Sequence, residues 1–194
     1  MRSTPMHGYL HHLPNLISAA RIVLVGPIVW SLLQREFGLA IALFVVAGAS
    51  DGLDGYLAKR YGWSSRLGGI LDALADKFLL ISTFVCLWWL GLFPWWLVAA
   101  ILLRDLVIVT GGTIYNYRVE RVQPEPTLIS KLNTVLQIVL AAVGVAQLGF
   151  GGIPGWLVDG LIWAVMLTVL LSGAGYVREW SRRARSKGFH HAHD

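Results

Sequence analysis

The chain has 194 residues, of which 56% are hydrophobic and 14% are charged, and its formal net charge is +5. Soluble domains carry about 25% charged residues, so this composition excludes an ordinary water-soluble domain and indicates an integral membrane protein. The basic residues cluster in loops and in the tail beside apolar spans, which favours a role in membrane topology and argues against nucleic-acid binding. The single cysteine, Cys86, excludes a disulfide framework.

Six apolar segments follow one another along the chain, each close to the ~20 residues that a bilayer-spanning helix needs. We expect the spans at about residues 15–33, 39–59, 68–90, 95–117, 128–148 and 153–176. Residues 9–13 predict a short interfacial turn before the first span. The predicted fold class is therefore an all-α integral membrane protein with six transmembrane helices and a short N-terminal interfacial segment. It divides into an N-terminal segment (1–13), a six-helix domain (14–176) and a basic, histidine-bearing tail (177–194) that we expect to fray.

The distribution of lysine and arginine predicts the orientation of these spans. One set of alternate loops and both termini hold most of the basic residues, namely Arg2, Lys59, Arg60, Arg66, Arg118, Arg121, Lys131, Arg178, Arg182, Arg183, Arg185 and Lys187. The opposite loops hold Arg35 alone. The positive-inside rule then places both termini in the cytoplasm with six crossings, as in a multi-pass protein of a bacterial inner membrane or its equivalent.

Four aspartates stand out in a chain that has only 11 acidic residues. Asp51 and Asp54 are three residues apart and Asp72 and Asp76 are four apart, so each pair lies on one face of its helix. The second span descends to the cytoplasmic side and the third ascends from it, so both pairs reach a common level. Ionised side chains at membrane depth are costly and indicate function. Their mutual repulsion is relieved by cations, and oxygen-only ligands favour Mg²⁺, Mn²⁺ or Ca²⁺.

These aspartates form part of a longer pattern, D-x2-D-G-x2-A-R-x8-G-x3-D-x3-D. The chain matches every gap of it with Asp51, Asp54, Gly55, Ala58, Lys59, Gly68, Asp72 and Asp76. In this respect it resembles the CDP-alcohol phosphatidyltransferases. Lys59 stands where that family has arginine, which keeps a point charge for phosphate but loses the bidentate fork, and Arg60 follows it. Ala73 stands where the family commonly has proline.

The resemblance implies an enzyme that transfers the phosphatidyl group of CDP-diacylglycerol to an alcohol and releases CMP. It implies that Asp51, Asp54, Asp72 and Asp76 hold two divalent ions, Mg²⁺ or Mn²⁺, and that Asp76 is the general base. It assigns the cytidine diphosphate site to Gly55, Ala58, Lys59 and Gly68. It also implies lipid substrates, a bilayer and a homodimer as partners, and an active site on the cytoplasmic side.

The acceptor alcohol is indicated only by softer similarities. Residues 13–27 are similar to the start of bacterial glycerophosphate-transferring members and of cardiolipin synthases, whereas 103–107 and 126–137 are similar to CMP-forming cardiolipin synthases. Phosphatidylglycerol is therefore the favoured acceptor, with glycerol 3-phosphate as the alternative. The candidate residues for binding the acceptor headgroup are Arg104, Arg118, Lys131 and Arg66. For Arg104, substrate binding and structural pairing stay open.

Other interpretations of the same residues remain. A six-helix cation transporter could use the four carboxylates as its ion site, although acidic residues near the bilayer midplane would then be expected. Asn15, Arg21, Asn133 and Gln137 lie in the same half of the predicted bundle as the aspartates. Gly48 is expected to pack helices closely. The terminal histidines His7, His11, His12, His190, His191 and His193 indicate opportunistic metal binding only.

Overall fold

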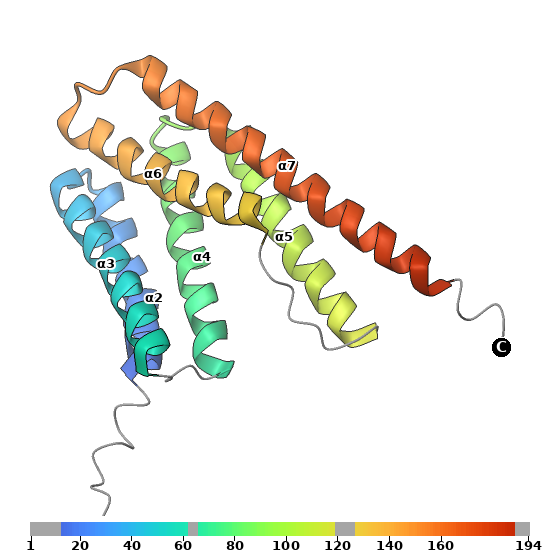
Figure 1. Ribbon diagram of the computed structural model, residues 1–194. Helices are drawn as coiled ribbons and strands as arrows, with labels where there is room; N and C mark the ends of the chain where they lie inside the picture. Colours follow the sequence, from blue (N-terminus) through green and yellow to red (C-terminus); the bar gives the residue numbers. More distant parts are fainter. Residues whose placement is uncertain (1–12, 62–65, 119–126, 189–194) are drawn as a thin grey trace, which may run out of the picture. The chain divides into compact units, whose positions relative to one another are not determined.

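The computed structural model describes residues 13–61, 66–118 and 127–188, and these residues form six α-helices (Figure 1). The helices are α2 (Leu13–Leu33), α3 (Phe37–Tyr61), α4 (Arg66–Trp89), α5 (Trp95–Arg118), α6 (Leu128–Phe150) and α7 (Gly155–Gly188). Each coincides with a predicted span, and the all-α prediction is confirmed for this part of the chain. The described helices include three that are long and apolar enough to cross a membrane, at Leu16–Leu33, Leu128–Phe150 and Gly155–Tyr176. Six membrane crossings remain a prediction, and residues 9–12 of the predicted interfacial turn lie outside the described residues.

The last helix is longer than the sequence indicated. α7 continues to Gly188, so the prediction that the tail frays is wrong for residues 178–188. This stretch lacks proline and is rich in arginine, lysine and other good helix formers, which lets it extend the helix without an apolar pattern. The glycine at its end is the residue type that most often stops a helix.

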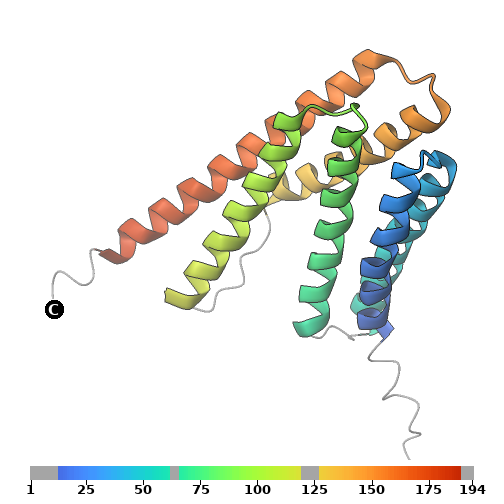
Figure 2. The same cartoon turned by 180° about the vertical axis from the view of Figure 1, so that it is seen from behind.

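The described chain divides into two units, and the first contains α2, α3, α4 and the end of α6 from Ala141. α2 packs against both α3 and α4, as the two opposite views show (Figures 1 and 2). Fully buried apolar side chains such as Ile28, Leu32, Phe84 and Leu87 form its core. Burial of each such side chain contributes about 1.5–3 kcal/mol.

A tight turn determines how α3 returns beside α2. The Glu36 N–H donates to the Ser31 carbonyl at 2.8 Å, and Arg35 adopts a left-handed conformation with φ 61°. This geometry ends α2 as a helix C-cap does. It sends α3 back alongside α2, so that the C-terminal half of α3 lies at the same end of the unit as the N-terminal halves of α2 and α4 (Figure 2).

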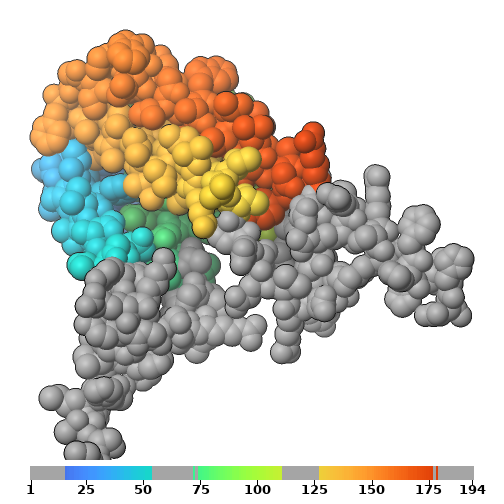
Figure 3. All heavy atoms as spheres, in the orientation of Figure 1, coloured from blue at the N-terminus to red at the C-terminus, as the bar shows by residue number. Residues whose placement is uncertain are grey.

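The second unit contains α5, α7 and the first half of α6, to Leu140. α5 packs against α7, and the Trp96 and Trp163 rings lie 5.5 Å apart between their centroids. Large apolar side chains of α7 are nevertheless exposed, and this helix occupies much of the surface of its unit in Figure 3. They are Trp156, Trp163, Leu167, Leu170 and Leu171. Such an exposed apolar face is what a lipid-facing helix presents.

Glycine permits close packing at a different place from the one predicted. Gly48 is exposed, and a Cβ built on it would meet no described atom within 4 Å, so its predicted packing role is wrong. At Gly144 of α6, a Cβ would lie 2.8 Å from Phe93 Cζ and 3.1 Å from Leu87 Cδ1. Both of these side chains are buried, so they have little room to move.

We expect Gly144→Ala to lower the free energy of unfolding by about 1–3 kcal/mol, because the added methyl overpacks the contact with Phe93 and Leu87. Thermal unfolding of the detergent-purified protein measures this. Gly160→Ala is the matched control, since a Cβ there meets no described atom within 4 Å and alanine favours helix by up to ~1 kcal/mol. Equal stability of the two variants would contradict the packing described.

Candidate metal centre

Three of the four predicted carboxylates converge in the first unit. Asp51 comes from α3, and Asp72 and Asp76 lie one turn apart on α4. One oxygen from each of the three carboxylates lies within 4.8 Å of the others. The antiparallel return of α3 and the adjacent start of α4 bring these positions to one level. The side chain of Asp54, also on α3, lies outside the described residues.

A buried arginine from α2 joins the three carboxylates. The Arg21 Nη1 lies 2.8 Å from Asp51 Oδ1, 3.0 Å from Asp72 Oδ1 and 2.5 Å from Asp76 Oδ1. The Arg21 side chain is 0% exposed, whereas the aspartate side chains are 40–41% exposed. The guanidinium therefore approaches from the closed side and leaves an open side to the carboxylates. Ser18, one turn before Arg21, adds a hydroxyl that donates to Asp72 Oδ1 at 3.5 Å.

Arg21 lies outside the signature motif, but its position in the sequence indicates that it has a special role. An arginine inside an apolar span indicates function or pairing by default, because its charge is costly there. From its position in the sequence, Arg21 is expected in the same half of the bundle as the aspartates, but the sequence does not assign it a particular role. The structure brings it into contact with all three described carboxylates.

The donor set of this cluster fits hard divalent cations. All of its candidate ligand atoms are carboxylate oxygens, which suit Mg²⁺, Mn²⁺ and Ca²⁺ and do not select Zn²⁺. The half-exposed aspartates are accessible to an ion and to a phosphate-bearing substrate from the same side. Two further groups of predicted site residues have side chains outside the described part of the chain: the nucleotide residues Gly55, Ala58, Lys59 and Gly68, and the acceptor residues Arg66 and Arg118.

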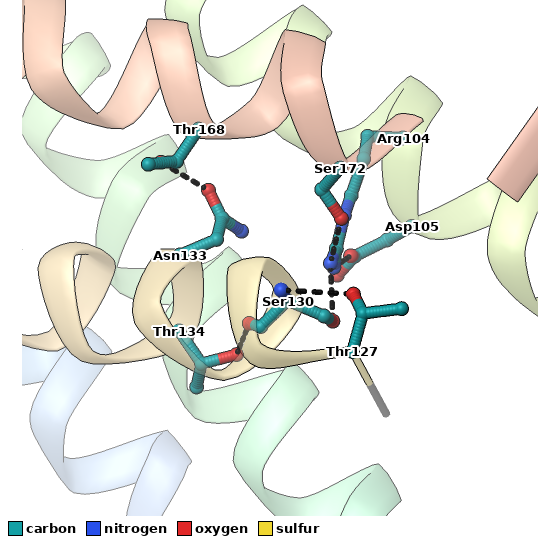
Figure 4. A network of polar contacts seen from close by, with 8 residues as sticks. All are labelled: Arg104, Asp105, Thr127, Ser130, Asn133, Thr134, Thr168 and Ser172. Carbon is teal, nitrogen blue, oxygen red and sulfur yellow. Dashed lines mark hydrogen bonds and ion pairs between the residues drawn. The ribbon is translucent and has the colours of Figure 1, made fainter. Parts of the chain in front are cut away.

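Arg104, the buried arginine of the second unit, is engaged by three side chains (Figure 4). Its Nη1 donates to Asp105 Oδ1 at 2.7 Å. Its Nη2 donates to Ser130 Oγ of α6 at 2.6 Å and to Ser172 Oγ of α7 at 2.8 Å, and its Nε donates to Ser172 Oγ at 3.3 Å. This network ties α5, α6 and α7 together. Of the two roles left open for Arg104, structural pairing is the one seen here.

Two amide side chains on α6 lie buried in the same unit. Asn133 accepts a hydrogen bond at its Oδ1 from the Thr168 hydroxyl at 2.9 Å (Figure 4). The Nδ2 of Asn133 and the Nε2 of Gln137 are buried without a hydrogen-bond partner among the described residues. Lys131, two residues before Asn133, is exposed. The start of α6 therefore combines an accessible cation with buried hydrogen-bond donors.

A family model described as CDP-alcohol phosphatidyltransferase matches residues 11–172. The chain belongs to this family. The match includes Arg21, the signature aspartates and the Arg104 network, so it covers parts of both units. Long apolar helices and membership in this family both indicate an integral membrane protein.

Curated relatives of this chain carry two different activities in their names. The chain is 31% identical over 187 residues to a probable CMP-forming cardiolipin synthase of Drosophila melanogaster, a match covering 85% of this chain and 56% of that protein. It is 32% identical over 185 residues to the chloroplastic CDP-diacylglycerol–glycerol-3-phosphate 3-phosphatidyltransferase 1 of Oryza sativa subsp. japonica, covering 85% and 56%. It is 37% identical over 103 residues to the CMP-forming cardiolipin synthase of Streptomyces coelicolor, covering 50% and 48%. The chain thus spans about half the length of the curated relatives it matches.

We expect Ser172→Ala to destabilise the protein by about 1.5–3 kcal/mol, because it removes an oxygen that accepts two hydrogen bonds from the charged Arg104. Thermal or denaturant unfolding in detergent checks this. Thr134→Ala is the control, since the exposed Thr134 hydroxyl bonds only its own helix, at the Ser130 carbonyl, among the described residues. A Ser172→Ala protein as stable as Thr134→Ala would show that the Arg104 network contributes nothing to stability.

Proposed function

We propose that this chain catalyses transfer of the phosphatidyl group of CDP-diacylglycerol to phosphatidylglycerol, giving cardiolipin and CMP. The observation that supports this most strongly is the convergence of Asp51, Asp72 and Asp76 at the signature positions of a chain that belongs to the CDP-alcohol phosphatidyltransferase family. Family membership also favours a transferase over the cation transporter that the same carboxylates could serve.

In this proposal Asp51, Asp54, Asp72 and Asp76 hold two divalent ions, Mg²⁺ or Mn²⁺. The oxygen-only donor set and its half-exposed position fit such ions. When bound, the ions would neutralise the diphosphate and stabilise charge that develops during phosphoryl transfer. The chain itself supplies the anionic cradle, and its apolar helices exclude bulk water from the side on which Arg21 lies.

The proposed role of Asp76 is that of general base. The acceptor hydroxyl oxygen forms a bond to the phosphatidyl phosphorus, and the bond from that phosphorus to the CMP oxygen breaks. Asp76 takes the hydroxyl proton, and CMP leaves with the electron pair. Arg21 contacts Asp76 Oδ1, and a carboxylate has further acceptor sites, one of which would take the proton in this proposal.

The cytidine diphosphate site is proposed at the junction of α3 and α4. Gly55 and Gly68 would let the nucleotide approach the backbone, and Lys59 would neutralise a phosphate as a point charge. A cytoplasmic orientation of this end, with both termini on that side and six crossings, follows from the distribution of basic residues. We also propose that the chain forms a homodimer, as the family resemblance implies.

Phosphatidylglycerol is proposed as the acceptor ahead of glycerol 3-phosphate. Relatives named as CMP-forming cardiolipin synthases occur at 31% identity in Drosophila melanogaster and 37% in Streptomyces coelicolor. The plant relative at 32% identity is named for glycerol 3-phosphate, which keeps that acceptor as the second candidate. The two are distinguished by which one supports CMP release.

Lys131 is the proposed direct contact of the acceptor headgroup, since it is exposed at the start of α6. The buried amides of Asn133 and Gln137 supply hydrogen-bond donors next to it. The other residues proposed to bind the acceptor headgroup are Arg104, Arg66 and Arg118. Arg104 would have to exchange a partner such as Ser130 to reach an acceptor phosphate.

The central test measures CMP release by detergent-purified protein with CDP-diacylglycerol, Mn²⁺ or Mg²⁺, and one acceptor at a time. We expect cardiolipin with phosphatidylglycerol and no phosphatidylglycerophosphate with glycerol 3-phosphate. Asp72→Asn and Asp76→Asn should each lower kcat about a thousandfold, because stabilisation by a metal or base amounts to several kcal/mol. Asp159→Asn, which changes an exposed aspartate of α7, is the control and should retain activity. Full activity of Asp72→Asn would refute the proposed centre.

We expect Lys131→Ala to raise the KM for the anionic acceptor about tenfold without changing the KM for CDP-diacylglycerol, because one charge contact to a headgroup phosphate is worth roughly 1 kcal/mol or more. Initial rates at varied concentrations of each substrate separate the two constants. Arg178→Ala removes an exposed charge from α7 and serves as the control. A rise in both KM values, or in neither, would show that Lys131 does not recognise the acceptor.

A further inference from the structure

Arg21 contacts the acidic cluster in an unusual way, through one nitrogen shared by three carboxylates. Its Nη1 lies within 3.0 Å of an oxygen of Asp51, Asp72 and Asp76, which belong to two different helices. The arginine is 0% exposed and lies within an apolar span. Arg21 itself is not part of the signature motif, which starts at Asp51.

The charge of Arg21 is permanent. A guanidinium stays protonated under all conditions that a protein survives, and a buried one is tolerated only when it is paired. Three carboxylates with oxygens within 4.8 Å of one another repel, and a fixed positive charge among them offsets that repulsion. The formal charges of these three carboxylates and Arg21 sum to −2 before Asp54 is counted, so the cluster still attracts divalent cations.

The same carboxylates keep the capacity to bind a cation. Arg21 contacts Oδ1 of each aspartate from the closed side. Each carboxylate has a second oxygen and accepts more than one bond per oxygen, and the aspartates are about two-fifths exposed on the other side. A cation that enters from the open side would be held by the same carboxylates as Arg21. Its positive charge and that of Arg21 would then repel each other at short range.

We propose that Arg21 is a permanent counter-cation of the acidic cluster, a positioning residue that holds the three carboxylates together and limits their affinity for a divalent ion. This inference rests on the proposed metal centre. Its consequence is that the protein folds around the cluster without needing the ion, and that the ion binds less tightly than three carboxylates alone would bind it. Ser18 supports the arrangement from the same face of α2 through Asp72.

The test uses the full chain in detergent, stripped of metal with EDTA, and Mn²⁺ as the probe. The Kd for Mn²⁺ is measured from the electron paramagnetic resonance signal of the free ion, and thermal unfolding is followed with and without Mn²⁺. For Arg21→Gln we expect a lower unfolding temperature without metal, about tenfold tighter Mn²⁺ binding, and a larger stabilisation by Mn²⁺, because a repelling charge at a few ångströms has been removed.

Two further variants separate charge from general damage. Arg21→Lys keeps the charge but reaches fewer of the three oxygens, so we expect lower stability with a Kd for Mn²⁺ within about threefold of the wild type. Arg104→Gln removes the other buried arginine, which contacts Asp105, Ser130 and Ser172, and should lower stability without changing Mn²⁺ affinity. If Arg21→Gln folds only when Mn²⁺ is present, the proposal is supported in its strongest form.

Several outcomes would overturn the inference. Unchanged or weaker Mn²⁺ binding by Arg21→Gln would show that Arg21 does not limit the affinity, and an unchanged unfolding temperature would show that it does not hold the carboxylates together. Tenfold tighter binding by Arg21→Lys would show that charge is not the cause. If the wild type releases CMP but neither it nor any variant binds Mn²⁺, the proposed metal centre itself is wrong, which is a different failure.

Discussion

The electrostatic balance between Arg21 and the carboxylates of Asp51, Asp72 and Asp76 is the constraint on which the first unit depends. Each of these groups is costly to place in an apolar helix alone, and together they offset one another. Because Arg21 is on α2, Asp51 on α3 and the other two on α4, the balance exists only when all three helices pack in one register. The arrangement of the site and the packing of the three helices therefore depend on each other.

The second unit also pairs a buried arginine, but without an acidic cluster. Arg104 is buried there too, but it is balanced by one neighbouring carboxylate, Asp105, and by the hydroxyls of Ser130 and Ser172. Hydroxyls carry no charge, so this network has no excess negative charge to attract a divalent ion. The contrast is consistent with the proposed metal-assisted phosphoryl transfer in the first unit and with the proposed binding of an anionic headgroup in the second.

The sequence predicted the helices well, because long apolar runs separated by polar turns have one simple interpretation in a membrane protein. It missed the extension of α7 through residues 178–188, since that stretch is helical by propensity and has no apolar pattern. The aspartates were found from their place in apolar spans, their spacing and the resemblance to the CDP-alcohol phosphatidyltransferase signature. Their contact with Arg21 could not be, because it depends on the register between helices, and the same limitation led to Gly48 being chosen over Gly144 as the close-packed glycine.

The most direct test of the metal-dependent transferase is anomalous diffraction from crystals grown with Mn²⁺ and CDP, using protein that releases CMP in solution. We predict anomalous peaks bounded by Asp51, Asp72 and Asp76, on the side opposite Arg21, and their number would give the count of ions. If crystals of active protein show no peak at these carboxylates, or a peak only elsewhere, the proposed metal centre is wrong.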